Sequence, residues 1–186
     1  MTRARRTASA RARRIDVLVV CTGNLCRSPI IATMLSYALP GQVIRSAGTN
    51  APIGQPWHPL AIESLADAGY HVKGKAHQVR KPHVRDAKLI LTAEGAHRGF
   101  VVGLDEWAAD RTYTLLEAAR LLADVPARSG IGSSALALHL ALALRMRPNE
   151  FDDDLADPLL GTIDDFRHCL RVARSAVEQL LPALRD

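Results

Sequence analysis

The strongest folding signal in this sequence is a buried strand that passes through a short loop into a helix. Residues 15–20 are mostly apolar and β-branched, which is typical of a strand covered on both faces of a parallel sheet. From Ser28 onward apolar residues recur at spacings of three and four, and Pro29 suits a first helical position. Residues 21–27 therefore precede a helix N-terminus, where unpaired backbone N–H groups and the helix dipole favour a bound anion.

The residue types in this loop, which reads Cys-Thr-Gly-Asn-Leu-Cys-Arg-Ser from Cys21 onward, suit covalent phosphate chemistry. Cysteines that face a helix N-terminus and an arginine are commonly thiolates at neutral pH, so Cys21 is the predicted nucleophile. Arg27 can hold two phosphate oxygens with its planar guanidinium, which lysine cannot do. Asn24 tolerates a turn and can brace it, while Ser28 is close enough to donate to the Cys21 sulfur. The predicted phosphate-binding loop comprises Thr22, Gly23, Asn24, Leu25, Cys26 and Ser28.

With Cys-x5-Arg-Ser, an internal Gly-Asn and a second cysteine before the arginine, the loop resembles that of low-molecular-weight protein tyrosine phosphatases. Residues 46–49, 87–92 and 112–117 continue the resemblance, which covers residues 15–184 with an inserted stretch at 124–151. It implies hydrolysis of phosphate monoesters through a cysteinyl phosphate, with phosphotyrosine proteins or small aryl phosphates as substrates and no cofactor. In that family an aspartate before a proline is the general acid, and here it is Asp157.

The choice of acid can also be argued from chemistry, because a positioned acid typically contributes ~10² to 10⁴ in rate by protonating the leaving oxygen. The candidates are Glu150, Asp152, Asp153, Asp154 and Asp157. Pro158 biases Asp157 towards an extended conformation and stiffens its placement, so Asp157 is preferred. We interpret Asp152 to Asp154 as a solvated acidic turn. No histidine or ligand spacing supports a metal site here.

Strands and helices alternate along the chain. Strands are expected at residues 15–20, 42–46, 87–92 and 111–114, and helices at 28–39, 58–69, 93–102, 115–123, 133–146 and 163–184. This order predicts an α/β, flavodoxin-like fold, a doubly wound four-stranded parallel sheet with helices on both faces. Ligands bind such sheets outside the carboxyl ends of the strands, which is where Cys21 lies.

The formal charge of +5 comes from the first 14 residues, which contain six arginines and no acid. Residues 15–186 hold 18 basic and 19 acidic groups, so a nucleic-acid partner is not expected. Residues 1–14 are predicted to be a disordered basic tail, and residues 15–186 one phosphatase domain. Neither a secretory signal nor a membrane span is predicted. Three cysteines without a disulfide pattern predict a cytoplasmic protein.

Substrate choice is less constrained, because aromatic residues that many relatives place around the phosphotyrosine ring are missing here. The expected substrate walls are Pro52, Trp57, Leu159 and Leu160. A phosphoarginine phosphatase is one alternative; such relatives carry a hydroxyl residue where this chain has apolar Leu25, which favours an aryl phosphate. Two further alternatives are arsenate reduction with an external thiol and phosphotyrosine binding without turnover. Cys26 is interpreted equally well as a packing residue or as a thiol that captures oxidised Cys21.

Overall fold

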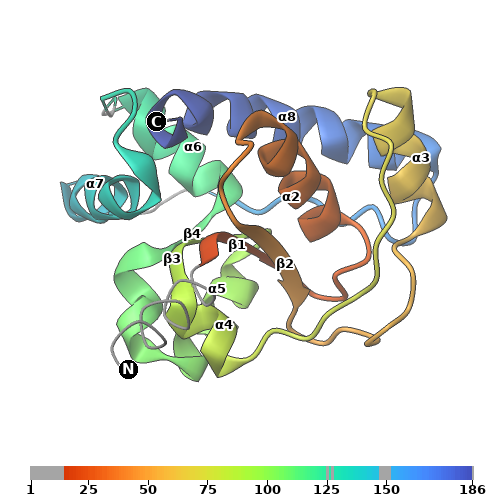
Figure 1. Ribbon diagram of the computed structural model, residues 1–186, viewed down its shortest axis with the longest axis horizontal. Helices are drawn as coiled ribbons and strands as arrows, with labels where there is room; N and C mark the ends of the chain where they lie inside the picture. The colour runs from red at the N-terminus through yellow and green to blue at the C-terminus, as the bar shows by residue number, and fades with distance from the viewer. Residues whose placement is uncertain (1–14, 125, 127, 147–151, 186) are drawn as a thin grey trace, which may run out of the picture.

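The computed structural model describes residues 15–185 except 125, 127 and 147–151, so the predicted basic tail and Glu150 lie outside the described residues. Its centre is one sheet of four parallel strands, β1 (Ile15–Cys21), β2 (Ile44–Gly48), β3 (Ala87–Thr92) and β4 (Thr112–Thr114). The strand order is β2-β1-β3-β4, with β2 and β4 at the edges (Figure 1). The doubly wound fold class predicted from the sequence is confirmed.

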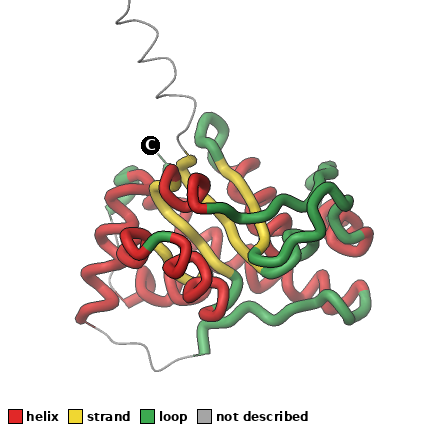
Figure 2. Tube along the Cα trace, turned by 90° about the horizontal axis from the view of Figure 1, so that it is seen from below, coloured by secondary structure: helices red, strands yellow, loops and turns green. Residues whose placement is uncertain are grey.

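Helices cover both faces of this sheet, as the tube in Figure 2 shows. One face carries α2 (Arg27–Ala38), α3 (Pro59–Asp67), α6 (Leu115–Asp124), α7 (Gly132–Met146) and α8 (Ile163–Leu184). The other face carries α4 (Lys81–Asp86), α5 (Gly95–Leu104) and the 3₁₀ helix η1 (Glu106–Arg111). Side chains of a strand alternate between faces; Val17 and Val19 accordingly join the first layer, while Leu18 and Val20 join the second.

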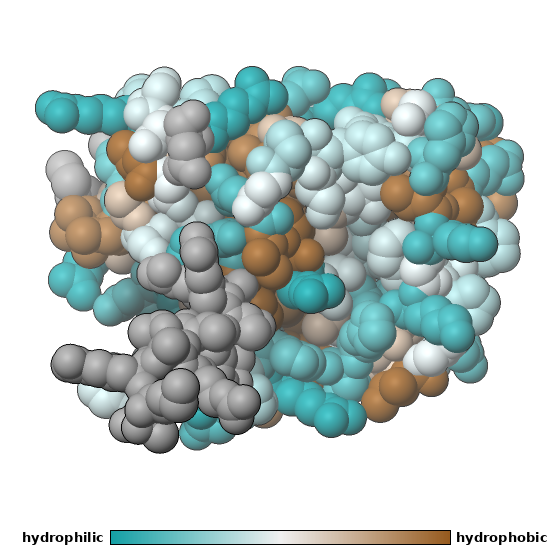
Figure 3. Space-filling view, viewed as in Figure 1, coloured by the Kyte–Doolittle hydropathy of each residue, from teal (hydrophilic) through white to brown (hydrophobic). Residues whose placement is uncertain are grey.

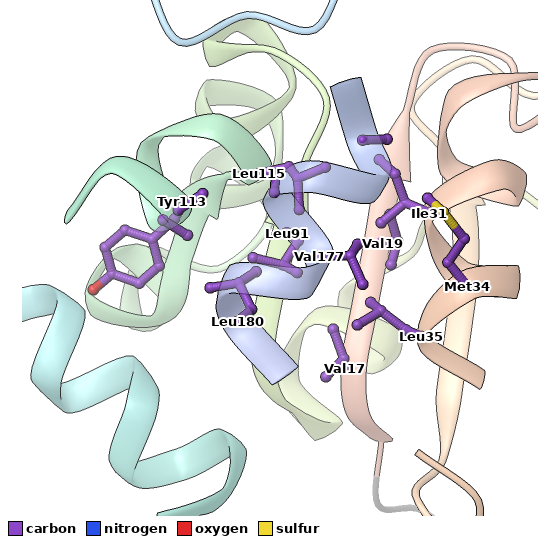
Figure 4. Close-up of a cluster of buried hydrophobic side chains, with 14 of the residues drawn as sticks. Val17, Val19, Ile31, Met34, Leu35, Leu91, Tyr113, Leu115, Val177 and Leu180 are labelled. Carbon is purple, nitrogen blue, oxygen red and sulfur yellow. The ribbon is translucent and has the colours of Figure 1, made fainter. Parts of the chain in front are cut away.

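The larger core lies between the sheet, α2 and α8 (Figure 4). Val19 and Leu91 project from β1 and β3 towards Ile31 of α2 and Val177 of α8. Each of these side chains is at most 2% exposed, and full burial of such a side chain contributes about 1.5–3 kcal/mol. Helix α2 is buried along its first nine residues, so the loop that precedes it rests on a rigid base.

The structure departs from the sequence-based expectations mainly in short elements. Helix α4 and η1 were not predicted, because six residues are too few to show a helical period. Strand β2 runs from Ile44 to Gly48 instead of over residues 42–46, since it pairs with β1 from Val17 to Cys21. Helix α7, within the predicted insertion, packs Leu136 and Leu140 into the core. None of the described helices is long and apolar enough to cross a membrane.

Candidate active site

The loop between β1 and α2 is braced by the side chain of Asn24. Asn24 has a left-handed backbone conformation, with φ of 54°. Its Nδ2 donates to the hydroxyls of Ser28 and Ser46, both at 2.9 Å, and its Oδ1 accepts the His77 backbone N–H at 2.9 Å. The Ser28 hydroxyl also lies 2.9 Å from the Cys21 sulfur. These contacts are the brace and the hydroxyl–sulfur contact that the sequence predicts.

Gly48, at the end of β2, comes into close contact with the backbone of the loop. A β-carbon at this position would lie 2.4 Å from the Thr22 carbonyl oxygen and 2.9 Å from the Asn24 nitrogen. The next two residues also hold the loop, because the Thr49 and Asn50 N–H groups donate to the Cys21 and Thr22 carbonyls at 2.9 Å. The loop therefore needs a glycine beside it.

Arg27 is buried, at 2% exposure, and its guanidinium lies between two carboxylates. Nη2 is 2.6 Å from Asp157 Oδ2, whereas Nη1 pairs with Glu94 and donates to the Leu155 carbonyl at 3.0 Å. Burial lowers the pKa of Arg27, but the hydrogen bond to Glu94 and the two negative charges outweigh it, so the pKa is raised. The guanidinium is charged and held in one orientation.

Glu94 and His97 form a second layer around the loop that the sequence analysis missed. His97 Nε2 lies 2.8 Å from Thr22 Oγ1, and the ring is 4% exposed. Burial lowers the pKa of His97, Glu94 opposes that shift, and the charge of Arg27 adds to it. His97 Nδ1 has no hydrogen-bond partner within the described residues. The imidazole is therefore neutral at pH 7 and fixed against Thr22.

Among the described carboxylates of the acidic segment, Asp157 reaches Arg27, and its Oδ1 accepts the Leu159 N–H at 3.1 Å. Asp153 is instead 8% exposed and pairs with Arg120 at 2.7 Å. Asp154 accepts the Gly95 N–H at the start of α5 at 2.7 Å, and Asp152 accepts the Asp154 N–H at 3.2 Å. The interpretation of residues 152–154 as a solvated turn is therefore wrong for Asp153.

A cavity of about 230 Å³ lies over the loop. Its lining includes Cys21, Arg27 and Asp157, together with Leu25, Asn50, Pro52 and Leu159. Of the four expected substrate walls, Pro52 and Leu159 line this cavity. Trp57 does not, because its ring packs against Gly74, where a β-carbon would lie 2.5 Å from the ring. Leu160 is 99% exposed and also lies outside. Asn50, which the sequence analysis missed, follows the strand next to β1.

Three free thiols lie at or below this site. Cys26 lines the cavity beside Cys21, and Cys169 is buried in α8. Burial raises the pKa of both Cys26 and Cys169 to about 12, so both are protonated at neutral pH. Within the described part of the chain, no three His, Cys, Asp or Glu residues are grouped as a metal site requires.

The chain is similar to known phosphatases. The family model of low molecular weight phosphotyrosine protein phosphatases matches residues 16–121. The probable tyrosine phosphatase EpsP of Ralstonia solanacearum is 42% identical over 83 residues, which are 44% of this chain and 57% of EpsP. The protein-arginine-phosphatase of Geobacillus stearothermophilus is 29% identical over 171 residues, 91% of this chain and 93% of that protein.

Two solved structures share the fold over most of their length. The YwlE arginine phosphatase from Geobacillus stearothermophilus superposes with a TM-score of 0.69 at 26% identity, covering 89% of each chain. The tyrosine phosphatase AmsI of Erwinia amylovora has a TM-score of 0.70 at 25% identity, covering 92% of this chain and 95% of AmsI. The similarity therefore extends to tyrosine and arginine phosphatases alike.

Proposed function

This chain belongs to the low molecular weight phosphotyrosine protein phosphatase family, and we propose that it hydrolyses phosphorylated side chains of proteins through a cysteinyl phosphate. The observation that carries this proposal is the convergence of Cys21, Arg27 and Asp157 on one cavity. No cofactor enters the reaction. We assign the protein to the cytoplasm, because a cysteine nucleophile has to stay reduced.

In the first step the Cys21 sulfur attacks phosphorus and the bond to the leaving oxygen breaks. The Ser28 hydroxyl, 2.9 Å from the sulfur, stabilises the thiolate. Loop N–H groups and the Arg27 guanidinium hold the phosphoryl oxygens, as helix N-termini and arginine forks do for phosphate. Glu94 keeps Arg27 oriented from the side opposite Asp157.

Asp157 supplies the proton that the leaving oxygen needs. Its side chain is 37% exposed, so it can exchange a proton with solvent and can swing from Arg27 towards the substrate. In the second step the Asp157 carboxylate takes a proton from water, the water oxygen bonds to phosphorus, and the sulfur–phosphorus bond breaks. Phosphate leaves and the Cys21 thiolate is restored.

The cavity favours an aryl phosphate, since Leu25, Pro52 and Leu159 give it apolar walls. Phosphoarginine is the second candidate substrate, because one relative that matches 91% of the chain is a protein-arginine-phosphatase. Parallel hydrolysis of a phosphotyrosyl and a phosphoarginyl peptide decides between them. We expect the larger kcat/KM with phosphotyrosine; a larger value with phosphoarginine would reverse the assignment. Arsenate reduction, tested alongside, should not occur.

The role of Asp157 is tested by Asp157→Asn, with Asp154→Asn as the matched control three residues away. Asp157→Asn should lower kcat with phenyl phosphate by roughly 10² to 10³, and by less with p-nitrophenyl phosphate, whose leaving group scarcely needs a proton. Asp154→Asn keeps its acceptor for Gly95, so its kcat should stay within about twofold. A large loss at Asp154 that depends on the leaving group, without one at Asp157, would contradict the assignment.

The covalent step is tested by Cys21→Ser. This variant should lose turnover but still bind inorganic phosphate or vanadate, because the loop amides and Arg27 remain in place. Turnover at a rate near that of the parent chain would rule out Cys21 as the nucleophile. Trapping phosphate on Cys21 with rapid acid quenching, followed by mass spectrometry, would detect the intermediate directly.

A further inference from the structure

The segment between Asp67 and Asp86 carries only positively charged side chains, and the proposed phosphatase reaction does not use them. It contains no acidic residue, whereas five lysines and arginines lie within it: Lys73, Lys75, Arg80, Lys81 and Arg85. Three histidines, His71, His77 and His83, are interspersed with them. Because residues 15–186 as a whole contain 18 basic and 19 acidic groups, this segment makes one part of the surface strongly positive.

Part of this segment runs beside β2, the edge strand of the sheet (Figure 1). Two cavities of about 320 and 290 Å³ adjoin there, and both are lined by Arg45, Ser46 and His77. The first also includes His83, and the second includes Lys73 and Lys75. We call these two cavities together the β2 groove. On this face hydrophilic side chains surround a central apolar strip, as Figure 3 shows.

The positive charges of the β2 groove are available to a ligand. Among the described residues Arg45, Lys73 and Lys75 form no ion pair, and no acidic side chain lines either cavity. The pKa of His83 is lowered by its burial and by the positive charge of Arg80. A site with this charge attracts anions.

The β2 groove adjoins the phosphate-binding loop. His77 donates its backbone N–H to Asn24 Oδ1, and Ser46 accepts from Asn24 Nδ2, both at 2.9 Å. Ser46 lines the groove, and Pro52, six residues later, lines the active-site cavity. Six residues span at most about 20 Å, so one extended segment of a ligand can reach both places if it crosses over residues 77–79, which pair with Gly48.

An extended polypeptide fits the β2 groove better than a nucleic acid does. The outer side of an edge strand offers backbone donors and acceptors that an added strand can pair with. The only bridge that the described residues form on that side of β2 is Gly48–Gln78, at the end of the strand. Single-stranded nucleic acids, in contrast, bind on exposed aromatic rings. Trp57 lines the second cavity, but it is half-buried and its ring packs against Gly74.

We propose that the β2 groove binds an acidic, extended segment of the phosphoprotein substrate, next to the phosphorylated residue that enters the active site. This inference rests on the proposed function for the identity of the substrate. The groove would then select among phosphoproteins by their flanking sequence, while the small cavity over Cys21 recognises only the phosphorylated side chain.

The test uses two phosphotyrosyl peptides, in one of which glutamates flank the phosphotyrosine and in the other glutamines. Their binding is measured to the full chain carrying Cys21→Ser, because this variant does not hydrolyse the peptides. Lys73→Glu/Lys75→Glu reverses two groove charges. Arg128→Glu/Arg171→Glu changes net charge by the same amount at exposed positions outside both cavities. Fluorescence anisotropy gives Kd for each pair.

The glutamate peptide should bind the parent more tightly than the glutamine peptide, and the groove variant should weaken its binding about tenfold. The control variant should change it by less than about twofold, and the preference should vanish at about 1 M salt, where charges are screened beyond ~3 Å. Hydrolysis of p-nitrophenyl phosphate by Lys73→Glu/Lys75→Glu in the chain with Cys21 intact should equal that of the unsubstituted chain.

Equal affinities for the two peptides, or equal losses in the groove and control variants, would overturn the proposal. So would a single-stranded oligonucleotide that binds more tightly than the glutamate peptide and loses its binding in the groove variant. If the chain with Cys21 intact hydrolysed neither aryl phosphate nor phosphoarginine, the proposed function would fail. The peptide comparison, which needs no turnover, would still decide whether the groove binds acidic segments.

Discussion

Replacing Gly48 by alanine should damage both the stability of the domain and the activity of the loop. The added β-carbon would lie 2.4 Å from the Thr22 carbonyl oxygen and 2.9 Å from the Asn24 nitrogen, and neither backbone atom can turn away as a side chain could. Overpacking of this kind costs about 1–3 kcal/mol. For a domain of this length, each kcal/mol lowers Tm by roughly 2–4 °C, so we expect a fall of about 2–12 °C by circular dichroism.

The loop must also shift to admit the methyl group, and a displacement of about 1 Å near the reacting atoms costs about 10² in rate. The kcat/KM of Gly48→Ala for an aryl phosphate should therefore fall by that factor at a temperature where the variant is folded. The matched control is Gly103→Ala in α5, where no atom lies within 4 Å of the new β-carbon. There the same substitution should raise stability by about 0.5–1 kcal/mol. Parent-like Tm and kcat/KM in Gly48→Ala would refute the close-contact argument.

Four further substitutions test other parts of the site. Arg27→Lys should lower kcat/KM by more than about 10² and should also lower Tm, because one ammonium cannot bind Glu94, Asp157 and phosphate together. Steady-state kinetics measure the first effect and thermal melts measure the second. Leu25→Thr should raise the ratio of phosphoarginine to phosphotyrosine hydrolysis; an unchanged ratio would show that this position does not set substrate choice. If Cys26 captures oxidised Cys21, then Cys26→Ser should reduce the activity that dithiothreitol restores after peroxide treatment, whereas full recovery would leave Cys26 as a packing residue. The buried His97 has a pKa below its ordinary 6.5, so the unfolded chain binds the extra proton and stability is lost as pH falls below 6.5. His97→Gln should make this loss smaller in urea unfolding between about pH 7 and 5, while the share from His83 remains.

The phosphate-binding loop could be predicted in detail because its signals are local. The apolar strand, the helical spacing after Ser28 and the chemistry of Cys21 and Arg27 all fall within a short stretch of chain. Asp157 was identified by the proline that follows it and by the family pattern. These inferences need no knowledge of which distant segments meet, which is why the placement of Ser28 against the Cys21 sulfur could be expected.

The positions of the remaining site residues depend on tertiary contacts, which the sequence does not show directly. Trp57 follows the expected wall residue Pro52 by five residues, yet its ring packs against Gly74, which has no side chain to exclude it. Glu94 comes directly after β3, and the carboxyl end of β3 lies beside that of β1 because the two strands pair in parallel. Inspecting the residues after each strand would therefore have pointed to Glu94 and Asn50. Nothing in the sequence distinguishes Asp153 as the carboxylate that Arg120 buries.

The balance of charge in the site explains why two carboxylates contact one arginine. Arg27 offers a single positive charge, while Glu94, Asp157 and a Cys21 thiolate would together supply three negative ones before a phosphate dianion arrives. Attraction to Arg27 alone cannot overcome that repulsion, so the backbone N–H groups of the loop and the helix dipole have to contribute much of the anion binding. One carboxylate must also move away from the guanidinium when a phosphate binds there. Asp157 is the more exposed of the pair, at 37% against 28% for Glu94, and it lines the cavity. The carboxylate with room to swing away from Arg27 is thus the one that the proposed mechanism uses as the acid, so substrate binding and acid catalysis are coupled through Arg27.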